Sequence, residues 1–130
     1  PTLSVVLACR NEARWLPDAL AALTAEVVDG WVDTVIVDDG STDRTAEVAE
    51  AHGRPLPGLR VIRTEPTNRS TAINVGVAAS TGEAVVLLDG DDVVAPGYVA
   101  TLQAALVDHP FVAARLVKAT RAHARCAVAS

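Results

Sequence analysis

The hydrophobic pattern of this chain switches repeatedly between continuous apolar runs and apolar residues at helical spacing. Short continuous apolar runs predict five strands, at residues 3–8, 34–37, 59–63, 85–88 and 111–117. Between these runs, helical spacing and capping residues predict four helices, at about 16–28, 44–52, 70–80 and 96–107. Strands and helices that alternate in this way predict an α/β fold with a largely parallel sheet flanked by helices.

Polar content distinguishes two of the predicted strands. Residues 85–88 are Val-Val-Leu-Leu, which predicts a central strand buried on both faces. Residues 59–63 interleave arginines with apolar residues, which predicts an edge strand. Gly76 lies inside a predicted helix, where glycine costs about 1 kcal/mol relative to alanine. We therefore expect a close approach to the sheet or to a ligand at Gly76.

Acidic residues follow three of the predicted strands. Glu12 lies after the first strand, Asp38 and Asp39 end the second, and residues 89–92 (Asp-Gly-Asp-Asp) follow the run at 85–88. Because the carboxyl ends of parallel strands open on one edge of a sheet, we expect these acids to converge there. Clustered carboxylates repel one another, and a divalent cation is a common reason to keep them together. The pattern favours a metal site that holds a diphosphate; the alternative is an acidic surface turn after a core strand.

Composition narrows the function classes. The 130 residues suffice for one domain, 50% of them are apolar, and the net charge of −5 argues against nucleic-acid binding. No apolar stretch reaches the roughly 20 residues of a transmembrane helix. Cys9 and Cys126 form no disulfide framework, which favours a cytoplasmic setting, and we interpret Cys9 as a buried small residue rather than a nucleophile. The basic residues of the tail after residue 117 leave peripheral membrane contact as a lesser alternative.

Four segments carry a resemblance to a known family. They are SVVLACRNE at 4–12, VIVDDGSTD at 35–43, AINVG at 72–76 and LLDGDD at 87–92. In this order and spacing they resemble motifs of family 2 glycosyltransferases, which have a Rossmann-like GT-A fold. The last segment is similar to the Asp-x-Asp metal motif of that family.

The resemblance implies an inverting, hexosyltransferase-like enzyme that uses a nucleotide-sugar donor, most often a UDP-sugar, and transfers the sugar to an acceptor. It implies that Asp39 contacts the base or ribose, and that Asp89 and Asp91 hold Mn²⁺ or Mg²⁺. The residues expected to bind the nucleotide-sugar are Ala8, Arg10, Glu12, Asp39, Arg69, Asp89, Gly90 and Asp91.

The chain departs from the family pattern at three positions. Ala8 stands where the family often has proline, and Ile73 stands where a basic residue is usual, a loss for which we expect Arg69 to compensate. Asn68 falls where glycine is common, and asparagine tolerates a left-handed conformation.

The largest departure is length, because the family's catalytic base lies well past the metal motif. We expect that base beyond Ser130, and interpret residues 1–130 as a single donor-binding domain without the acceptor-binding half. The sequence identifies neither the acceptor nor the oligomeric state.

Two alternative functions stay open. One is a nucleotide-binding module without transfer activity. The other is a haloacid-dehalogenase-type phosphatase, because residues 86–93 match its Asp-x-Asp-x-Val pattern. The phosphatase needs more chain after Asp89 and leaves the acidic segment at 38–43 unexplained.

Overall fold

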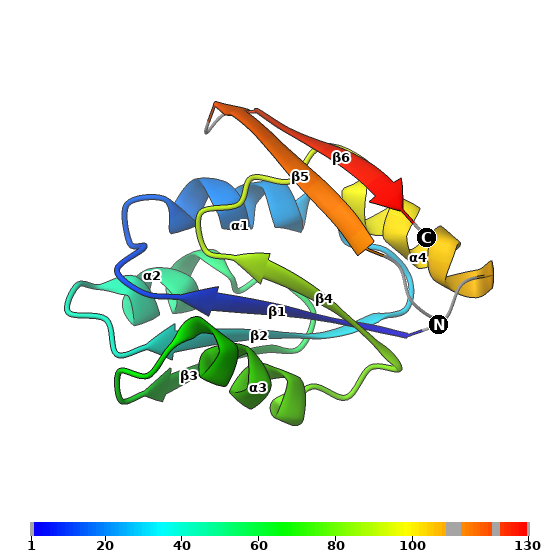
Figure 1. The fold of residues 1–130 in the computed structure, drawn as a ribbon. Coiled ribbons are helices and arrows are strands. Elements are labelled where there is room, and N and C mark those ends of the chain that lie inside the picture. The colour runs from blue at the N-terminus through cyan, green and yellow to red at the C-terminus, as the bar shows by residue number, and fades with distance from the viewer. Residues whose placement is uncertain (1, 109–112, 121–122, 130) are drawn as a thin grey trace.

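A computed structural model describes residues 2–108, 113–120 and 123–129 of the chain. It contains a four-stranded sheet with helices on both faces, and a separate two-stranded sheet (Figure 1). The strands of the larger sheet are β1 (Leu3–Cys9), β2 (Trp31–Asp39), β3 (Leu59–Thr64) and β4 (Ala84–Asp89). The helices are α1 (Leu16–Thr24), α2 (Thr45–His52), α3 (Arg69–Ala79) and α4 (Tyr98–Asp108). The smaller sheet pairs β5 (Ala113–Thr120) with β6 (His123–Ala129).

The larger sheet is parallel throughout, with strand order β3-β2-β1-β4, and the predicted α/β class is confirmed. β1 lies inside the sheet, and all seven of its residues are buried. Its side chains alternate between two apolar clusters: Val5 and Leu7 pack on the side of α1, whereas Val6 and Ala8 pack on the side of α3. This alternation explains why the run at the start of the chain is apolar at nearly every position.

The prediction of a central position for residues 85–88 is wrong. Their strand, β4, pairs only with β1 among the described residues and forms an edge of the four-stranded sheet. Leu87 is 47% exposed. The physical reason is that α3 packs mainly over β1 and β2, so it leaves Leu87 on the same face of β4 largely uncovered. The edge position predicted for residues 59–63 is confirmed, because β3 lies at the opposite edge.

Helix α3 approaches the sheet closely at Gly76. A Cβ atom built at Gly76 would overlap Val6 Cγ1 and would lie 3.2 Å from Val37 Cγ2. The glycine predicted to mark a close approach therefore lets the helix backbone rest directly on β1 and β2.

Helix α1 is shorter than predicted. Leu16, Leu20 and Leu23 form its buried stripe, but Val27, which continues the same spacing, is 45% exposed. The helix ends because the Glu26 amide donates to the Leu23 carbonyl at 2.8 Å, a tighter turn that breaks the helical pattern.

The predicted fifth strand is present, but it does not join the parallel sheet. Residues 113–117 belong to β5, which pairs antiparallel with β6, with Ala113 opposite Ala129. Residues 111 and 112, also predicted as strand, lie outside the described residues. Among the described helices, none combines the length and apolar character of a membrane span.

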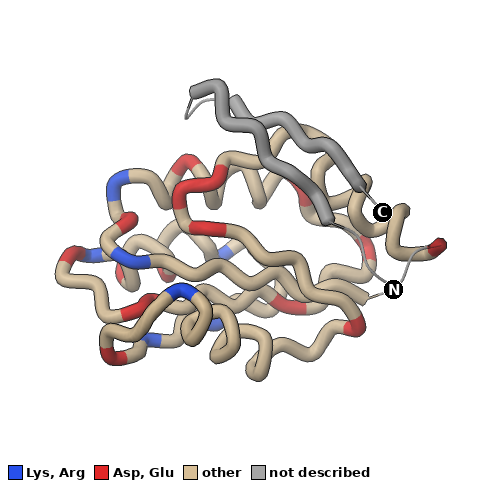
Figure 2. Tube along the Cα trace, in the orientation of Figure 1, with Lys and Arg blue, Asp and Glu red and all other residues tan. Residues whose placement is uncertain are grey.

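Acidic residues occur at both ends of the parallel sheet (Figure 2). At the amino end, buried Asp33 accepts hydrogen bonds from Ser4 Oγ on one oxygen and from the Thr81 amide and hydroxyl, both at 3.0 Å, on the other. Ser4 Oγ in turn accepts from the Gly82 amide at 2.8 Å, and Arg60 Nη2 lies 3.9 Å from Asp33. These bonds fix the start of β2 against β1 and the turn before β4.

Candidate functional site

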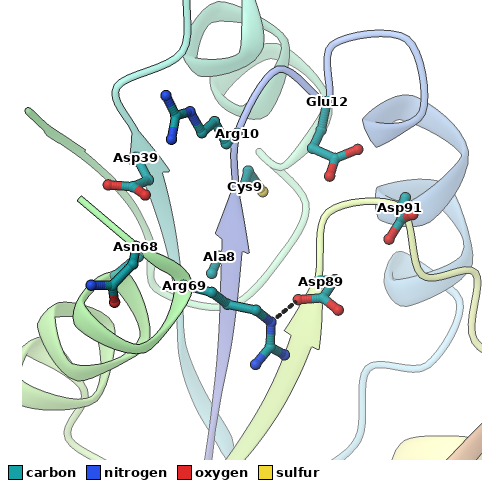
Figure 3. Close-up of a pocket in the computed structure, with 10 residues that line it drawn as sticks. Ala8, Cys9, Arg10, Glu12, Asp39, Asn68, Arg69, Asp89 and Asp91 are labelled. Atoms are coloured by element: carbon teal, nitrogen blue, oxygen red, sulfur yellow. Dashed lines mark hydrogen bonds and ion pairs between the residues drawn. The ribbon is translucent and has the colours of Figure 1, made fainter. Parts of the chain in front are cut away.

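A pocket of about 350 Å³ opens at the carboxyl ends of the parallel strands (Figure 3). Strands β1, β2 and β4, the loop after β1 and the first turns of α3 all contribute to its wall. The lining residues are Ala8, Cys9, Arg10, Glu12, Asp39, Asn68, Arg69, Ala72, Asp89 and Asp91.

Asp39, the last residue of β2, is held in one orientation by threonines. Its Oδ1 atom accepts from the Thr67 hydroxyl at 2.6 Å, the Thr67 amide at 2.9 Å and the Thr64 hydroxyl at 3.2 Å. The Thr67 hydroxyl is the largest cause that lowers the pKa of Asp39 below its ordinary value, and Arg10 adds to the effect. Asp39 is therefore a carboxylate at neutral pH, although it is only 4% exposed.

The loop after β1 is tied to the loop after β2. Asn11 adopts a left-handed conformation with φ of 53°, and its Oδ1 atom accepts from the Thr42 amide at 2.8 Å. The backbone N–H of Asn11 donates to Ser41 Oγ at 2.9 Å, and the backbone N–H of Glu12 donates to Thr45 Oγ1 at 3.0 Å. This clamp fixes the backbone that carries Arg10 and Glu12 into the pocket wall.

Asn68, which falls where the family often has glycine, does not use the left-handed conformation that asparagine tolerates. Its φ of −144° is extended, and its Oδ1 atom accepts from the Thr71 amide at 2.9 Å as the N-cap of α3. The cap stabilises the helix start that presents the next residue, Arg69, to the pocket. Arg69 Nε lies 2.7 Å from Asp89 Oδ1 across the pocket.

Three carboxylates lie close together at the end of β4. Ligand oxygens of Asp89, Asp91 and Asp92 all fall within 4.8 Å of one another. Asp92 is only 7% exposed, and its Oδ2 atom accepts from the Asp89 amide at 2.9 Å, which closes the turn. The cluster matches Mn²⁺ or Mg²⁺ in ligand type, because both cations prefer carboxylate oxygens.

Gly90 packs against β1 below the acidic turn. Its amide donates to the Ala8 carbonyl at 3.3 Å, and a Cβ atom there would lie 2.6 Å from Cys9 Sγ. Cys9 is buried, as interpreted from the sequence, and burial raises the pKa of its thiol well above the ordinary range, with a further rise from the neighbouring carboxylates, Glu12 first. The thiol stays protonated at neutral pH and is not a nucleophile.

The structure brings seven of the eight residues named for nucleotide-sugar binding into this pocket, and the eighth, Gly90, packs beneath it. Their individual roles stay predictions. The sequence interpretation missed Cys9, Asn68 and Ala72 as lining residues. It placed Asp92 in the acidic cluster but did not name it among the metal ligands, and the structure groups its carboxylate with those of Asp89 and Asp91. Asn68 and Ala72 are four positions apart at the start of a helix, a spacing that places both on one face.

A parallel α/β sheet with an acid-lined pocket at its carboxyl edge defines a ligand-binding domain of the Rossmann-like class. The family model for glycosyl transferase family 2 matches residues 4–124, and the chain belongs to that family. This membership agrees with the resemblance found in the sequence and gives no support to the phosphatase alternative.

Individual relatives extend the comparison. The uncharacterized glycosyltransferase alr2836 of Nostoc sp. (strain PCC 7120) is 37% identical over 95 residues, which cover 72% of this chain and 29% of that protein. Glucosyl-3-phosphoglycerate synthase from Mycobacterium tuberculosis superposes with a TM-score of 0.66 at 30% identity, covering 81% of this chain and 39% of that one. S. aureus TarS superposes with a TM-score of 0.76 at 22% identity, covering 92% and 37%, which shows the shared fold. The chain therefore spans less than half the length of each of these relatives.

Proposed function

We propose that this chain is the donor-binding part of an inverting glycosyltransferase that uses a UDP-sugar and a divalent cation. The observation that carries the proposal is that Asp39 lies in the same pocket as Asp89 and Asp91, although β1 separates β2 from β4 in the sheet. One end of the pocket offers a fixed carboxylate, and the other offers a cluster of them.

Two structural relatives support the choice of ligand. The synthase from M. tuberculosis has been solved in complex with Mn²⁺, UDP-glucose and phosphoglyceric acid, and TarS has been solved in complex with UDP. We assign the same ligand class, a uridine nucleotide with Mn²⁺ or Mg²⁺, to the pocket of this chain.

The uridine is assigned to the side of Asp39. The Oδ1 atom of Asp39 already accepts hydrogen bonds from Thr64 and Thr67. We therefore assign the Oδ2 atom of Asp39 to accept a hydrogen bond from an N–H of the base or a hydroxyl of the ribose. The small side chains of Ala8 and Ala72 line the pocket and leave room for a planar base against the sheet.

The cation is assigned to Asp89 and Asp91, and the diphosphate to the space beside them. When bound, the cation neutralises charge on the departing nucleoside diphosphate. The carboxylates hold it, the buried Asp92 keeps their turn closed, and Gly90 lets that turn lie against β1.

Inversion requires a base that takes the proton of the acceptor hydroxyl as that hydroxyl attacks the anomeric carbon. We place this base outside residues 1–130. In support, Asp108 is the only acid among residues 93–108, and it ends α4 and does not line the pocket. Residues 1–130 then form the donor-binding half, and transfer by this chain alone is expected to be slight or absent.

Calorimetric titration with UDP, with and without Mn²⁺, tests the proposal. We expect UDP to bind in the presence of Mn²⁺ and to bind much more weakly without it. We also expect Asp39→Ala to weaken UDP binding in both conditions. A folded sample that binds no nucleoside diphosphate with Mn²⁺ present would reject the proposal. A transfer assay on a longer protein containing this domain separates the enzyme from a binding module without activity.

A further inference from the structure

The pocket already contains a cation of its own, the guanidinium of Arg69. Arg69 Nε lies 2.7 Å from Asp89 Oδ1, and this ion pair joins the first residue of α3 to the last residue of β4 (Figure 3). Asp89 is also one of the clustered carboxylates whose oxygens lie within 4.8 Å of one another. The guanidinium thus pairs with one of the carboxylates to which a divalent cation is assigned, and its positive charge lies next to the proposed cation site.

Charge explains why an arginine lies there. Carboxylates at this separation repel one another, and a positive group placed on one of them lowers that repulsion while no metal ion is bound. A guanidinium and a divalent cation cannot both occupy the same face of Asp89 Oδ1 at bonding distance. A divalent cation on Asp89 is also repelled by the guanidinium beside it, so cation binding favours the movement of Arg69 away from Asp89.

We propose that Arg69 is the built-in counter-ion of Asp89, and that it leaves Asp89 for the diphosphate when a divalent cation and a nucleotide bind together. The inference rests on the proposed function and assigns this one residue within it. Arg69 lines the same pocket as the acids, so a diphosphate bound there lies within its reach. Guanidinium groups bind phosphate oxygens in a two-pronged geometry that compensates for the lost carboxylate.

The consequence is coupled binding. A cation that binds alone displaces Arg69 from Asp89 and gives it no new partner. When a cation and a diphosphate bind together, Arg69 exchanges Asp89 for the diphosphate, which is a stronger partner. Each ligand therefore strengthens the binding of the other, and part of this coupling passes through Arg69. The side chains are 60% exposed for Arg69 and 38% for Asp89, so the displacement is expected to change cation affinity by a modest factor, up to about fivefold.

The test is a titration with Mn²⁺ alone, followed by electron paramagnetic resonance of the free ion, on the wild-type chain and on Arg69→Ala. We expect Arg69→Ala to bind Mn²⁺ up to about fivefold more tightly than wild type in the absence of nucleotide. We expect the gain in Mn²⁺ affinity on adding UDP to be smaller in the variant than in wild type. Alanine suits the first turn of a helix, and circular dichroism checks that the fold is kept.

Two further variants serve as controls. Arg60→Ala removes the same charge from an arginine of similar exposure, 53%, that pairs with Asp33 at the other end of the sheet, and it should leave Mn²⁺ affinity unchanged. Arg69→Lys keeps the charge and should keep Mn²⁺ affinity within about twofold of wild type.

The outcomes separate this inference from the proposed function. Wild-type protein that binds no Mn²⁺ even with UDP present would remove the proposed metal site, and this inference with it. Mn²⁺ binding that Arg69→Ala leaves unchanged or weakens would overturn the inference alone, because Arg69 would then be a bystander or a support for Asp89. An equal gain in Arg60→Ala would also overturn it, since the effect would come from net charge.

Discussion

The two ends of the parallel sheet both carry buried acids, and the acids differ in how their oxygens are used. At the amino end, both oxygens of Asp33 have donors, from Ser4 on one side and Thr81 on the other. At the carboxyl end, the donors to Asp39 all reach a single oxygen, and Asp89 and Asp91 lie beside each other at a pocket. An acid bonded through both oxygens holds the fold, whereas the acids gathered at the pocket are the ones that we propose bind a ligand.

Asp33 and Asp39 show how much depends on this difference. Both lie on β2, and both are 4% exposed. Valine lies close to each of them in the sequence, with threonine next to Asp33 and a second aspartate next to Asp39. Their hydrogen-bond partners distinguish Asp33, a structural acid, from Asp39, the proposed binding acid. Substitution of Asp33 should therefore act mainly on stability, whereas substitution of Asp39, Asp89 or Asp91 should act mainly on ligand binding; substitutions of residues that support the pocket are expected to cost less stability than substitution of Asp33 does.

The largest effect on stability is expected for Asp33→Ala. The substitution leaves Ser4 Oγ and the Thr81 amide without their acceptor in a buried setting, so we expect the free energy of unfolding to fall by about 3 kcal/mol. Urea denaturation measures the loss. Asp33→Asn keeps one acceptor oxygen and should lose less; an equal loss would show that charge rather than hydrogen bonding matters at this end.

Gly90→Ala at the pocket floor is expected to lower the free energy of unfolding by about 2 kcal/mol, because the added Cβ would lie 2.6 Å from Cys9 Sγ. Removing the sulfur in the double variant Gly90→Ala/Cys9→Ala should restore part of the loss. The measurement is a double-mutant cycle of unfolding free energies. Strictly additive losses would mean that the clash with Cys9 is not what requires glycine at position 90.

The smallest effect, about 1 kcal/mol, is expected for Thr67→Val, which removes a hydroxyl donor from Asp39. The folded-state pKa of Asp39 is lowered, so its contribution to stability is present above the unfolded pKa near 3.9 and is lost as pH falls through the folded value. Wild type and Thr67→Val should differ in unfolding free energy at pH 6 and converge as pH falls through the lowered folded-state pKa of Asp39. A difference that persists undiminished at the acidic end would contradict the role given to the hydroxyl.

The sequence predicted the alternation of strands and helices because the period of apolar residues records which faces each segment buries. It did not predict the edge position of residues 85–88, since burial of Leu87 depends on where α3 packs. A run of apolar residues looks the same whether or not a helix covers its second face.

The acids of the pocket could be named from the sequence because each follows a strand directly and the strands are parallel. The contact between Arg69 and Asp89 could not, because it joins residues 20 positions apart through the angle at which α3 meets the sheet. The sequence likewise did not identify which asparagine is left-handed, because asparagine tolerates this conformation at either site. Asn11 adopts it where its side chain ties the loop after β1 to the loop after β2, and Asn68 is extended.

The most direct test of the account is the thermal shift of Asp91→Ala with and without UDP and Mn²⁺, measured beside wild type. We predict that the unliganded variant melts within a few degrees of wild type, because Asp91 lies in the turn after β4 and outside the core. We also predict that Mn²⁺ increases the UDP-dependent shift of wild type and leaves that of the variant unchanged. A variant that is destabilised without ligand, yet keeps the Mn²⁺-dependent shift, would show that the acids at the carboxyl end hold the fold and not a ligand.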